Sequence, residues 1–431
     1  MTVWPRRMRP LLPRSEAVGV DTLKVRDASD VEEAVRAAIA NDQPLEIIGH
    51  GSRRRIGQPM ATNAVLDLSA LSAVASYEPN ELIITVQAGA PLADVMSLID
   101  SKSQQFAFEP MHTASLLGIP GHGTIGGMIA AGLAGPRRIK AGGARDHLLG
   151  AHAVSGFGDS FKTGGKVVKN VTGYELCKLL AGSWGTLAVM TEVTLKVMPR
   201  PESERTLVLR GLDDLAANRA MTVALGSAFD VSGAAHVPGS SLRAAVAGLA
   251  PLGSPREAVT VLRLEGITAS AAHRAQTLAT ALAPFGTIEI LDDAASARVW
   301  TAVRDVESFA AGGPLGAWPL WRIVCPPASG GALGLALARD SGGEVMYDWG
   351  GGLIWAALPP KADAMATLVR LRTEAAGGHG TLLRASDAVR NEVDVFHPQP
   401  SGLAALNERV RSSFDPKVIL NRGRMKRGNP V

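Results

Sequence analysis

Apolar residues in the N-terminal half recur at helical spacing in some runs and form short continuous strands in others. Val31, Val35 and Ala38 lie on one face of a helix, and Ser29 to Glu32 fit a capping box at its start. Pro91 suits the first turn of a second helix. The predicted elements are helices over residues 31–40 and 91–100 and strands over residues 44–49, 64–69, 82–89 and 191–198.

A break at Pro199-Arg200-Pro201 separates this half from the rest of the chain. Beyond it, runs such as TLVLRG, AVTVLRLEG and LWRIVCP alternate with alanine-rich helical stretches as far as about residue 360, which favours a second α/β domain. The last segment is predicted to return to the first domain. The predicted division is an irregular leader (1–20), a first domain (21–200), a second domain (201–382) and a C-terminal segment (383–431).

Composition narrows the function classes. The 431 residues are 46% hydrophobic, enough for large cores, and the net charge is only +4. Aromatic residues are few and do not alternate with basic ones, which argues against a nucleic-acid partner. The basic groups at residues 53–55 and 137–140 lie beside glycine turns. We interpret both as solvated loop faces, with attraction of phosphate or of an acidic subunit as the alternative.

The cysteines and the N-terminal residues indicate the cellular compartment in which the protein is expected. Cys177 and Cys325 are too few to ligate an iron–sulfur cluster and form no CxxC pair. Cys177 lies in the apolar run ELCKLLAG and is expected in the core, so a reducing compartment is the simplest interpretation. The leader lacks the apolar region of a signal peptide, and no run of about 18 apolar residues occurs elsewhere. We therefore expect a cytoplasmic protein with no membrane span of its own, in contact with a membrane only through partner subunits.

The turn after the strand at residues 44–49 has the sequence GHGSRRRIG, and its amides are placed to cradle a phosphate. A dinucleotide-binding fingerprint is the rival interpretation, because Asp67 follows Gly49 by 18 residues. However, Arg54 occupies the position where that fingerprint needs its third glycine for close helix packing, and Pro59 interrupts the expected helix. NAD binding is therefore disfavoured; an ordinary surface turn remains the plain alternative.

Further glycine-rich turns occur between Gly123 and Pro199 and again near the C-terminus. They include TIGG, RDHLLG, KNVTGYEL, GTLAVMTEVTL and FDPKVILNRGRM. Glycine allows the backbone to approach a ligand closely. So many such turns in one segment predict a cleft lined by main chain for a large, flat, phosphate-bearing cofactor.

In this order the motifs resemble the FAD-binding domain of the vanillyl-alcohol oxidase (p-cresol methylhydroxylase) type. The resemblance implies an α+β protein, with a two-subdomain FAD-binding domain and an α/β cap-like second domain. It also implies FAD as cofactor. Covalent members carry histidine where this chain has Ser52, and His50 lies two positions earlier, so we expect non-covalent FAD. The implied cofactor-binding residues are Ile48, Gly49, His50, Gly51, Ser52, Thr124, Ile125, Gly126, Gly127, Ala130, Ala131, Gly142, Gly143, Asp146, Thr186, Val189, Asn421 and Gly423.

Three of these residues carry more specific expectations. Asp146 either reaches the cofactor or fixes its own loop. Val189 is expected to contact the adenosine end through its backbone, while its side chain fits an alternating strand core. Asn421 belongs to a turn expected to close against the flavin edge, in which Arg422 replaces the usual proline.

Catalytic residues are harder to predict. Similar 2-hydroxy-acid dehydrogenases use a strand H-x-G-D-G-N-x-H to bind a divalent metal, but the comparable strand here, Tyr347 to Trp355, has no histidine. We therefore predict no metal site. The candidates that remain are Arg322, for a substrate anion or an internal salt bridge, together with Asp348 and His397. A lone His397 is more typical of a surface or capping residue.

With its D-W-G-G-G strand and VDVFHPQP segment, the chain resembles the FAD-binding subunits of glycolate oxidases. The resemblance implies oxidation of glycolate or a similar small 2-hydroxy acid within a complex, and electron transfer to an iron–sulfur subunit. The implied partners are that subunit and a second flavoprotein subunit. Two alternatives stay open: an autonomous FAD-dependent 2-hydroxy-acid or alcohol dehydrogenase, and a scaffold that has lost FAD.

Overall fold

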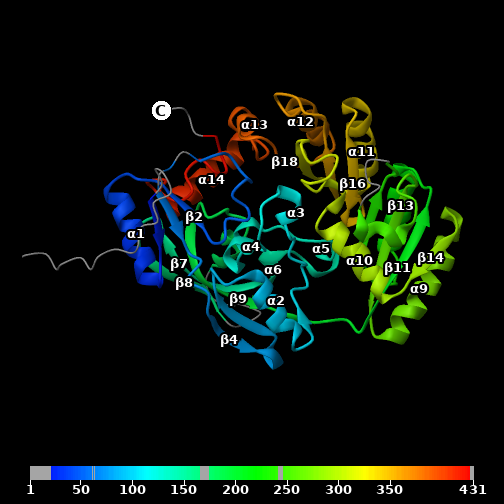
Figure 1. The fold of residues 1–431 in the computed structure, drawn as a ribbon, viewed down its shortest axis with the longest axis horizontal. Coiled ribbons are helices and arrows are strands. Elements are labelled where there is room, and N and C mark those ends of the chain that lie inside the picture. Colours follow the sequence, from blue (N-terminus) through cyan, green and yellow to red (C-terminus); the bar gives the residue numbers. More distant parts are fainter. Residues whose placement is uncertain (1–20, 61, 63, 166–173, 241–245, 428–431) are drawn as a thin grey trace, which may run out of the picture.

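The computed structural model describes residues 21–60, 62, 64–165, 174–240 and 246–427. Strands β1–β10 and strands β11–β18 form separate groups of sheets at the two ends of an elongated molecule (Figure 1). Helices and largely antiparallel sheets occur together, so the α+β class predicted from the sequence is confirmed. The predicted leader lies outside the described residues.

The first group contains a small parallel sheet in the order β1-β3-β2, formed by Asp21–Lys24, Ala64–Asp67 and Leu45–Ile48. Helix α1 (Ala28–Ala40) buries Val31 and Val35 in the same core. It begins at Asp27, whose side chain accepts from the amide of Asp30 at 2.9 Å. The predicted capping box was therefore wrong. Its Asp30 carboxylate is bound by Arg26 instead.

The second sheet of this group is antiparallel, in the order β4-β5-β9-β7-β8. Its apolar face packs against helices α2 (Leu92–Asp100) and α4 (Ile125–Ala131), with Ile84, Leu92 and Ile125 in one core. The strands are Val74–Glu78, Ile83–Gln87, Ala188–Lys196, Leu148–Ser155 and Ser160–Gly164, in that order. Other elements of this part are α2 (Leu92–Asp100), α3 (Ala114–Leu117), α4 (Ile125–Ala131), α5 (Arg138–Ala141), α6 (Ala144–His147), α7 (Cys177–Leu180) and the paired strands β6 (Gln104–Gln105) and β10 (Met198–Pro199).

The second group is one eight-stranded sheet in the order β14-β11-β13-β12-β16-β17-β15-β18. Every neighbouring pair is antiparallel, so the alternation of strands and helices does not produce the parallel sheet expected of an α/β domain. The strands are β11 (Ser203–Arg210), β12 (Val231–Val237), β13 (Val259–Gly266), β14 (Ile288–Leu291), β15 (Leu320–Val324), β16 (Glu344–Asp348), β17 (Leu353–Ala357) and β18 (His379–Arg384).

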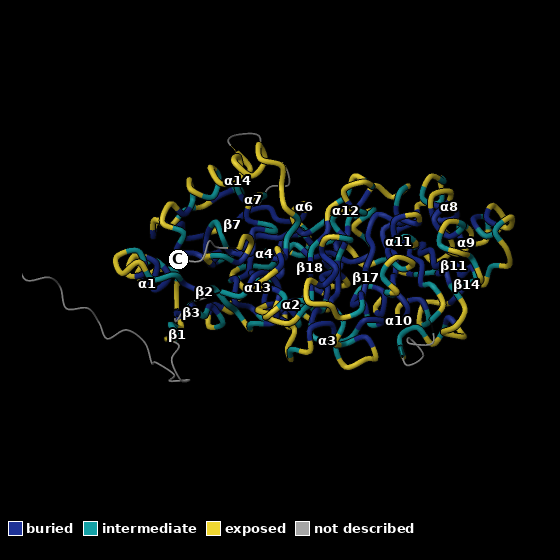
Figure 2. Tube along the Cα trace, turned by 90° about the horizontal axis from the view of Figure 1, so that it is seen from above, coloured by how far each residue is buried: buried dark blue, intermediate teal, exposed yellow. Residues whose placement is uncertain are grey.

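The two faces of this sheet have different partners. One face packs against helices, with Leu207 on β11 and Ile354 on β17 in their cores. The opposite face, including Val208 and Trp355, shares a core with the first group, and Figure 2 shows buried chain running through the middle of the molecule. The helices of this half are α8 (Asp214–Leu225), α9 (Thr268–Leu282), α10 (Asp293–Arg304), α11 (Pro327–Ser341) and α12 (Ala366–Ala375). Helices α13 (Asp387–Glu392) and α14 (Ser401–Phe414) follow β18, and α14 lies beside the first group (Figure 1), where the Phe414 carbonyl accepts from the Gly156 amide.

The segment Tyr347 to Trp355, predicted as one strand, is a hairpin. Strand β16 ends at Asp348, a turn follows, and β17 begins at Leu353. Gly350 and Gly351 have φ of 65° and 97°, which glycine adopts at little cost. The glycines therefore make a reversal here.

A buried ion cluster joins the two halves. The guanidinium of Arg263 on β13 donates to both carboxylate oxygens of Glu109, at 2.8 and 2.9 Å. Arg137 binds Glu265 and also lies 3.1 Å from Glu109. Glu204, the third carboxylate, has a pKa of about 7, raised mainly by burial. The prediction that the basic group at residues 137–140 is solvated was therefore wrong for Arg137.

Neutralising Glu109 tests this junction. We expect Glu109→Gln to lower the free energy of unfolding by about 3–5 kcal/mol, because it leaves the Arg263 guanidinium buried without its full counter-charge. Urea denaturation at pH 7 measures the difference. Asp100→Asn is the control, since Asp100 pairs with Arg200 at the surface, and it should cost about 1 kcal/mol or less. Equal effects of both substitutions would contradict the assignment.

Candidate functional site

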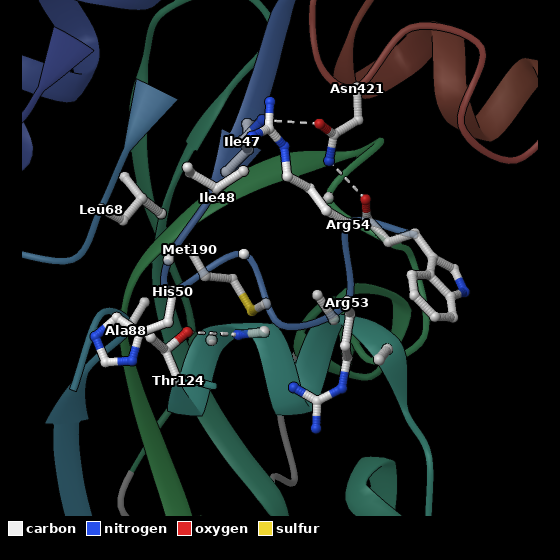
Figure 3. Close-up of a pocket in the computed structure, with 18 of the residues that line it drawn as sticks. Ile47, Ile48, His50, Arg53, Arg54, Leu68, Ala88, Thr124, Met190 and Asn421 are labelled. Carbon is white, nitrogen blue, oxygen red and sulfur yellow. Dashed lines mark hydrogen bonds between the residues drawn. The ribbon is translucent and has the colours of Figure 1, made fainter. Parts of the chain in front are cut away.

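A cleft lies where the parallel sheet, helix α4, strand β9 and the C-terminal segment meet (Figure 3). The lining residues are Ile47, Ile48, Gly49, His50, Gly51, Ser52, Arg53, Arg54, Leu68, Ala88, Thr124, Gly126, Gly127, Ala130, Ala131, Trp184, Gly185, Ala188, Met190, Asn421 and Arg424.

The turn after β2 forms one wall. Gly51 has φ of +66°, and the amide of Arg54 bonds back to the Gly51 carbonyl at 3.1 Å. In the part of the chain that the structure describes, the amides of Gly51, Ser52 and Arg53 donate no hydrogen bond. Successive amides freed by a left-handed residue form an anion-binding nest.

Missing side chains bring this wall close to the next one. A Cβ on Gly49 would lie 2.5 Å from the Thr124 hydroxyl oxygen, and one on Gly126 would lie 2.7 Å from the Ala88 Cβ. Thr124 starts helix α4 by accepting from the Gly127 amide at 3.3 Å. The cleft is therefore narrow and walled largely by main chain, which suits a flat ligand.

The C-terminal segment closes the cleft from the opposite side. The amide of Leu45 donates to Ile419, and the amide of Asn421 donates back to Leu45, which extends the parallel sheet. The side chain of Asn421 accepts from the Ile47 amide at 2.8 Å and donates to the Trp184 carbonyl at 2.7 Å. A single amide side chain thus ties the C-terminal turn to two walls.

Of the two arginines in the turn that line the cleft, one forms an ion pair and the other, among the described residues, does not. Arg54 forms an ion pair with Glu46, as the solvated-loop interpretation allows. Arg53 instead is buried, with 7% of its surface exposed, and makes no ion pair within the described residues. Burial lowers its pKa to about 10. The prediction of a solvated face was therefore wrong for Arg53, because the sequence does not show that its side chain turns inward beneath the loop.

Eleven of the predicted cofactor-binding residues come together in this cleft. They are Ile48, Gly49, His50, Gly51, Ser52, Thr124, Gly126, Gly127, Ala130, Ala131 and Asn421. They come from three stretches of the chain, residues 48–52, residues 124–131 and Asn421, yet line one space. The predicted cofactor-binding residues did not include Arg53 or Arg424, although both lie within quoted motifs, and attraction of phosphate was the less favoured alternative for residues 53–55.

The other predicted residues lie outside the lining. The side chains of Ile125 and Val189 are fully buried in cores, while Ala188 and Met190, on either side of Val189, line the cleft. Asp146 accepts from the Gly143 amide at 2.7 Å, next to Gly142, and so fixes its own loop.

Two further residues border the cleft without lining it. Thr186 bonds to the Ser183 carbonyl at 2.7 Å. Gly423 takes a φ of +84° in the C-terminal turn. Most of the KNVTGYEL motif falls on residues 166–173 and lies outside the described residues.

The catalytic candidates lie in the second group of sheets. The Arg322 guanidinium is 5.1 Å from the ring centroid of Trp349, and that of Arg138 is 4.5 Å from the same ring. The internal salt bridge considered for Arg322 is absent among the described residues. Asp348 is buried and accepts from the Trp349 amide at 2.7 Å.

Both ring nitrogens of His397 lie within contact distance of neighbouring polar groups. Its Nδ1 lies 3.2 Å from Arg370 and 3.3 Å from the Gly380 amide, and its Nε2 lies 3.5 Å from Glu374. No cluster of three or more His, Cys, Asp or Glu side chains suited to a metal occurs in the described ranges. Cys177 and Cys325 are free, buried thiols, and the buried position predicted for Cys177 is confirmed.

The geometry fits a flavin dinucleotide: free amides at one turn, a cradle that a Cβ would fill, and an unpaired buried guanidinium. Sequence comparison agrees with it. Residues 22–164 match the family model described as "FAD binding domain". The chain is 30% identical to glycolate oxidase subunit GlcE of Escherichia coli (strain K12), over 91% of this chain and 95% of that protein. It is 29% identical to glycolate oxidase subunit GlcD of Bacillus subtilis (strain 168), over 46% of this chain and 40% of that protein.

Solved structures share the fold at low sequence identity. The structure of p-cresol methylhydroxylase with bound substrate superposes with a TM-score of 0.69 at 13% identity, covering 95% of this chain and 90% of that chain. An alkyldihydroxyacetonephosphate synthase gives 0.64 at 15% identity, covering 93% of this chain and 76% of that chain. The chain therefore belongs to the FAD-binding oxidoreductases of the vanillyl-alcohol oxidase type, in the branch that contains GlcE.

Proposed function

We propose that this chain is an FAD-carrying subunit of a glycolate oxidase complex. It takes part in oxidising glycolate, or a similar small 2-hydroxy acid, to the 2-oxo acid. The observation that carries the proposal is the match to GlcE, which extends over 91% of this chain and 95% of that protein. FAD supplies the acceptor for the electrons of the substrate when it is bound.

The cofactor would lie in the cleft with its pyrophosphate over Gly51 and Ser52, where the amides are free. Small residues at Ala130 and Ala131 keep the neighbouring wall thin. Asn421 would hold the C-terminal turn against the other side of the ligand. Because serine stands at the position matched by the covalent histidine of other members, the FAD is held non-covalently.

Two partner subunits complete the proposal: a second flavoprotein and an iron–sulfur protein. The name of GlcD, like that of GlcE, describes a subunit, which supports a multi-subunit assembly. The two cysteines of this sequence are too few to hold an iron–sulfur cluster on four thiolates, so the cluster would belong to another polypeptide. We place the complex in the cytoplasm, in contact with a membrane through those partners. No helix in the described ranges is both long and apolar enough to cross a bilayer.

One observation favours an autonomous dehydrogenase as the second candidate. Arg322 and Arg138 stack on Trp349, and neither forms an ion pair with a carboxylate within the described residues. A guanidinium without a carboxylate partner can hold the carboxylate of a substrate through two hydrogen bonds. A substrate held there would be oxidised on this chain rather than on the partner.

Cofactor content is the first test. We expect the purified chain to be yellow and to release all its flavin into the supernatant on acid precipitation, because no covalent attachment holds it. Absorbance of the pellet and of the supernatant measures the division. Flavin retained by the pellet would contradict non-covalent binding, and a colourless chain that takes up no added FAD would contradict the proposal itself.

Anaerobic mixing with glycolate separates the two candidates. For the accessory subunit, we expect the flavin of the isolated chain to bleach at least about 100-fold more slowly than that of the assembled complex. A residual rate of this size fits a cleft that lacks its base and its substrate-holding groups. Stopped-flow absorbance follows the reaction. Fast bleaching of the isolated chain, lost in Arg322→Met, would establish the autonomous enzyme instead.

Asp348 gives the structure a pH dependence. Its pKa is raised to about 7, mainly by burial, so its contribution to stability is complete below its unfolded pKa and is lost as the pH rises through 7. We expect Asp348→Asn to raise the free energy of unfolding by about 1–4 kcal/mol at pH 8 and to change it little at pH 4. Thermal denaturation at both pH values measures this. An equal effect at the two would show that Asp348 is already charged at pH 4.

A further inference from the structure

The turn beside the cleft carries more positive than negative charge. Three guanidiniums, those of Arg53, Arg54 and Arg424, lie around it with one carboxylate, that of Glu46. Glu46 binds Arg54 and lies 3.8 Å from Arg424. Arg53 has neither that carboxylate nor another one within ion-pair distance among the described residues. The local charge is therefore about +2, carried by groups that line the cleft.

Arg53 is poorly satisfied for a buried cation. A guanidinium has five N–H donors, but that of Arg53 makes one hydrogen bond, to the Met111 carbonyl at 3.2 Å, and its Nε has no partner. An unpaired buried charge is costly, and a purely structural side chain would gain more from an apolar substitute. The free donors of Arg53 are therefore available to an anion that binds in the cleft.

The surrounding chain is shaped around this guanidinium. Gly123, just before α4, has φ of +79°, and a Cβ there would lie 2.9 Å from Nη1 of Arg53. The same Cβ would lie 2.5 Å from the Ser52 hydroxyl oxygen. Figure 3 shows Arg53 on the same side of the cleft as Thr124, across from Asn421. The side chain of Arg53 is thus held between the turn after β2 and the loop that leads into α4.

We propose that Arg53 is the charged anchor for the anionic part of the bound dinucleotide, kept buried and unpaired so that the cofactor provides its counter-charge. The inference rests on the proposed seat of FAD in this cleft. A flavin dinucleotide offers negative charge from two sources: the pyrophosphate, in every redox state, and the pyrimidine edge of the ring, once it is reduced. The excess of two positive charges matches the two negative charges of the pyrophosphate, which we take as the source.

Three variants test the anchor. Arg53→Met removes the charge at similar bulk, and Arg53→Lys keeps the charge but not the planar fork. Arg55→Met is the matched control, because Arg55 is exposed on the same turn and lies outside the cleft lining. Isothermal titration of the apoprotein with FAD, and separately with ADP, gives the affinities. Thermal denaturation of each apoprotein gives its stability.

We expect Arg53→Met to weaken both FAD and ADP binding about tenfold or more, the size of one lost charge-assisted hydrogen bond. Its apoprotein should unfold at the same temperature as the unsubstituted apoprotein or higher, since an unpaired buried charge is gone. Arg53→Lys should recover part of the affinity, and Arg55→Met should bind like the unsubstituted chain. Replacing a residue with a purely structural role would lower the unfolding temperature of the apoprotein. A lower affinity for FAD and ADP without that loss of stability is therefore not expected of a structural residue.

A different pattern would assign the charge to the ring. In that case the affinity of Arg53→Met for ADP stays unchanged. The affinity of its bound flavin for sulfite falls about tenfold, because the sulfite adduct leaves negative charge on the pyrimidine edge. The anchor is overturned if FAD, ADP and sulfite all bind normally to Arg53→Met, or if its apoprotein loses stability in step with its affinity. Failure of the unsubstituted chain to bind FAD or ADP would instead overturn the proposed seat of the cofactor.

Discussion

The close approach of the turn after β2 to the start of α4 is the constraint on which the site depends. It exists because Gly49 has no Cβ where the side chain of Thr124 stands, and the absence of a Cβ on Gly126 lets α4 approach Ala88 in the same way. Walls so near each other leave room for a thin ligand and expose main-chain amides to it. They also leave little room for charged side chains within the cleft, so charge has to come from groups such as Arg53 behind the turn.

Two buried arginines show how the surroundings decide what a guanidinium does. Arg263 lies between two halves of the molecule with carboxylates of Glu109 and Glu265 around it, and these raise its pKa despite complete burial. Arg53 has burial without carboxylates, and its pKa falls. The first arrangement is complete within the chain and serves the junction. The second is incomplete, which is the physical ground for assigning it to a ligand.

Much of the cleft could be predicted from the sequence because its walls are built by local rules. Gly51 occupies a turn with positive φ and Gly126 a close approach, and the order of the glycine-rich turns along the chain indicates the cofactor. Burial and pairing are not local. The inward course of Arg53 depends on Met111 and Gly123, residues far along the chain. The same limit applies to the second half, where antiparallel pairing brings together strands such as β12 and β16 that lie more than 100 residues apart.

The C-terminal turn has a bearing on how the protein is made. Strand β2 ends at Ile48, yet the hydrogen bond that completes its edge comes from Asn421, 374 residues later than Ile47. During synthesis on the ribosome, the turn after β2 and helix α4 therefore emerge long before the residue that closes this side of the cleft. This side of the cleft can close only after Asn421 has left the exit tunnel, so a chain terminated before that residue would lack the closing wall.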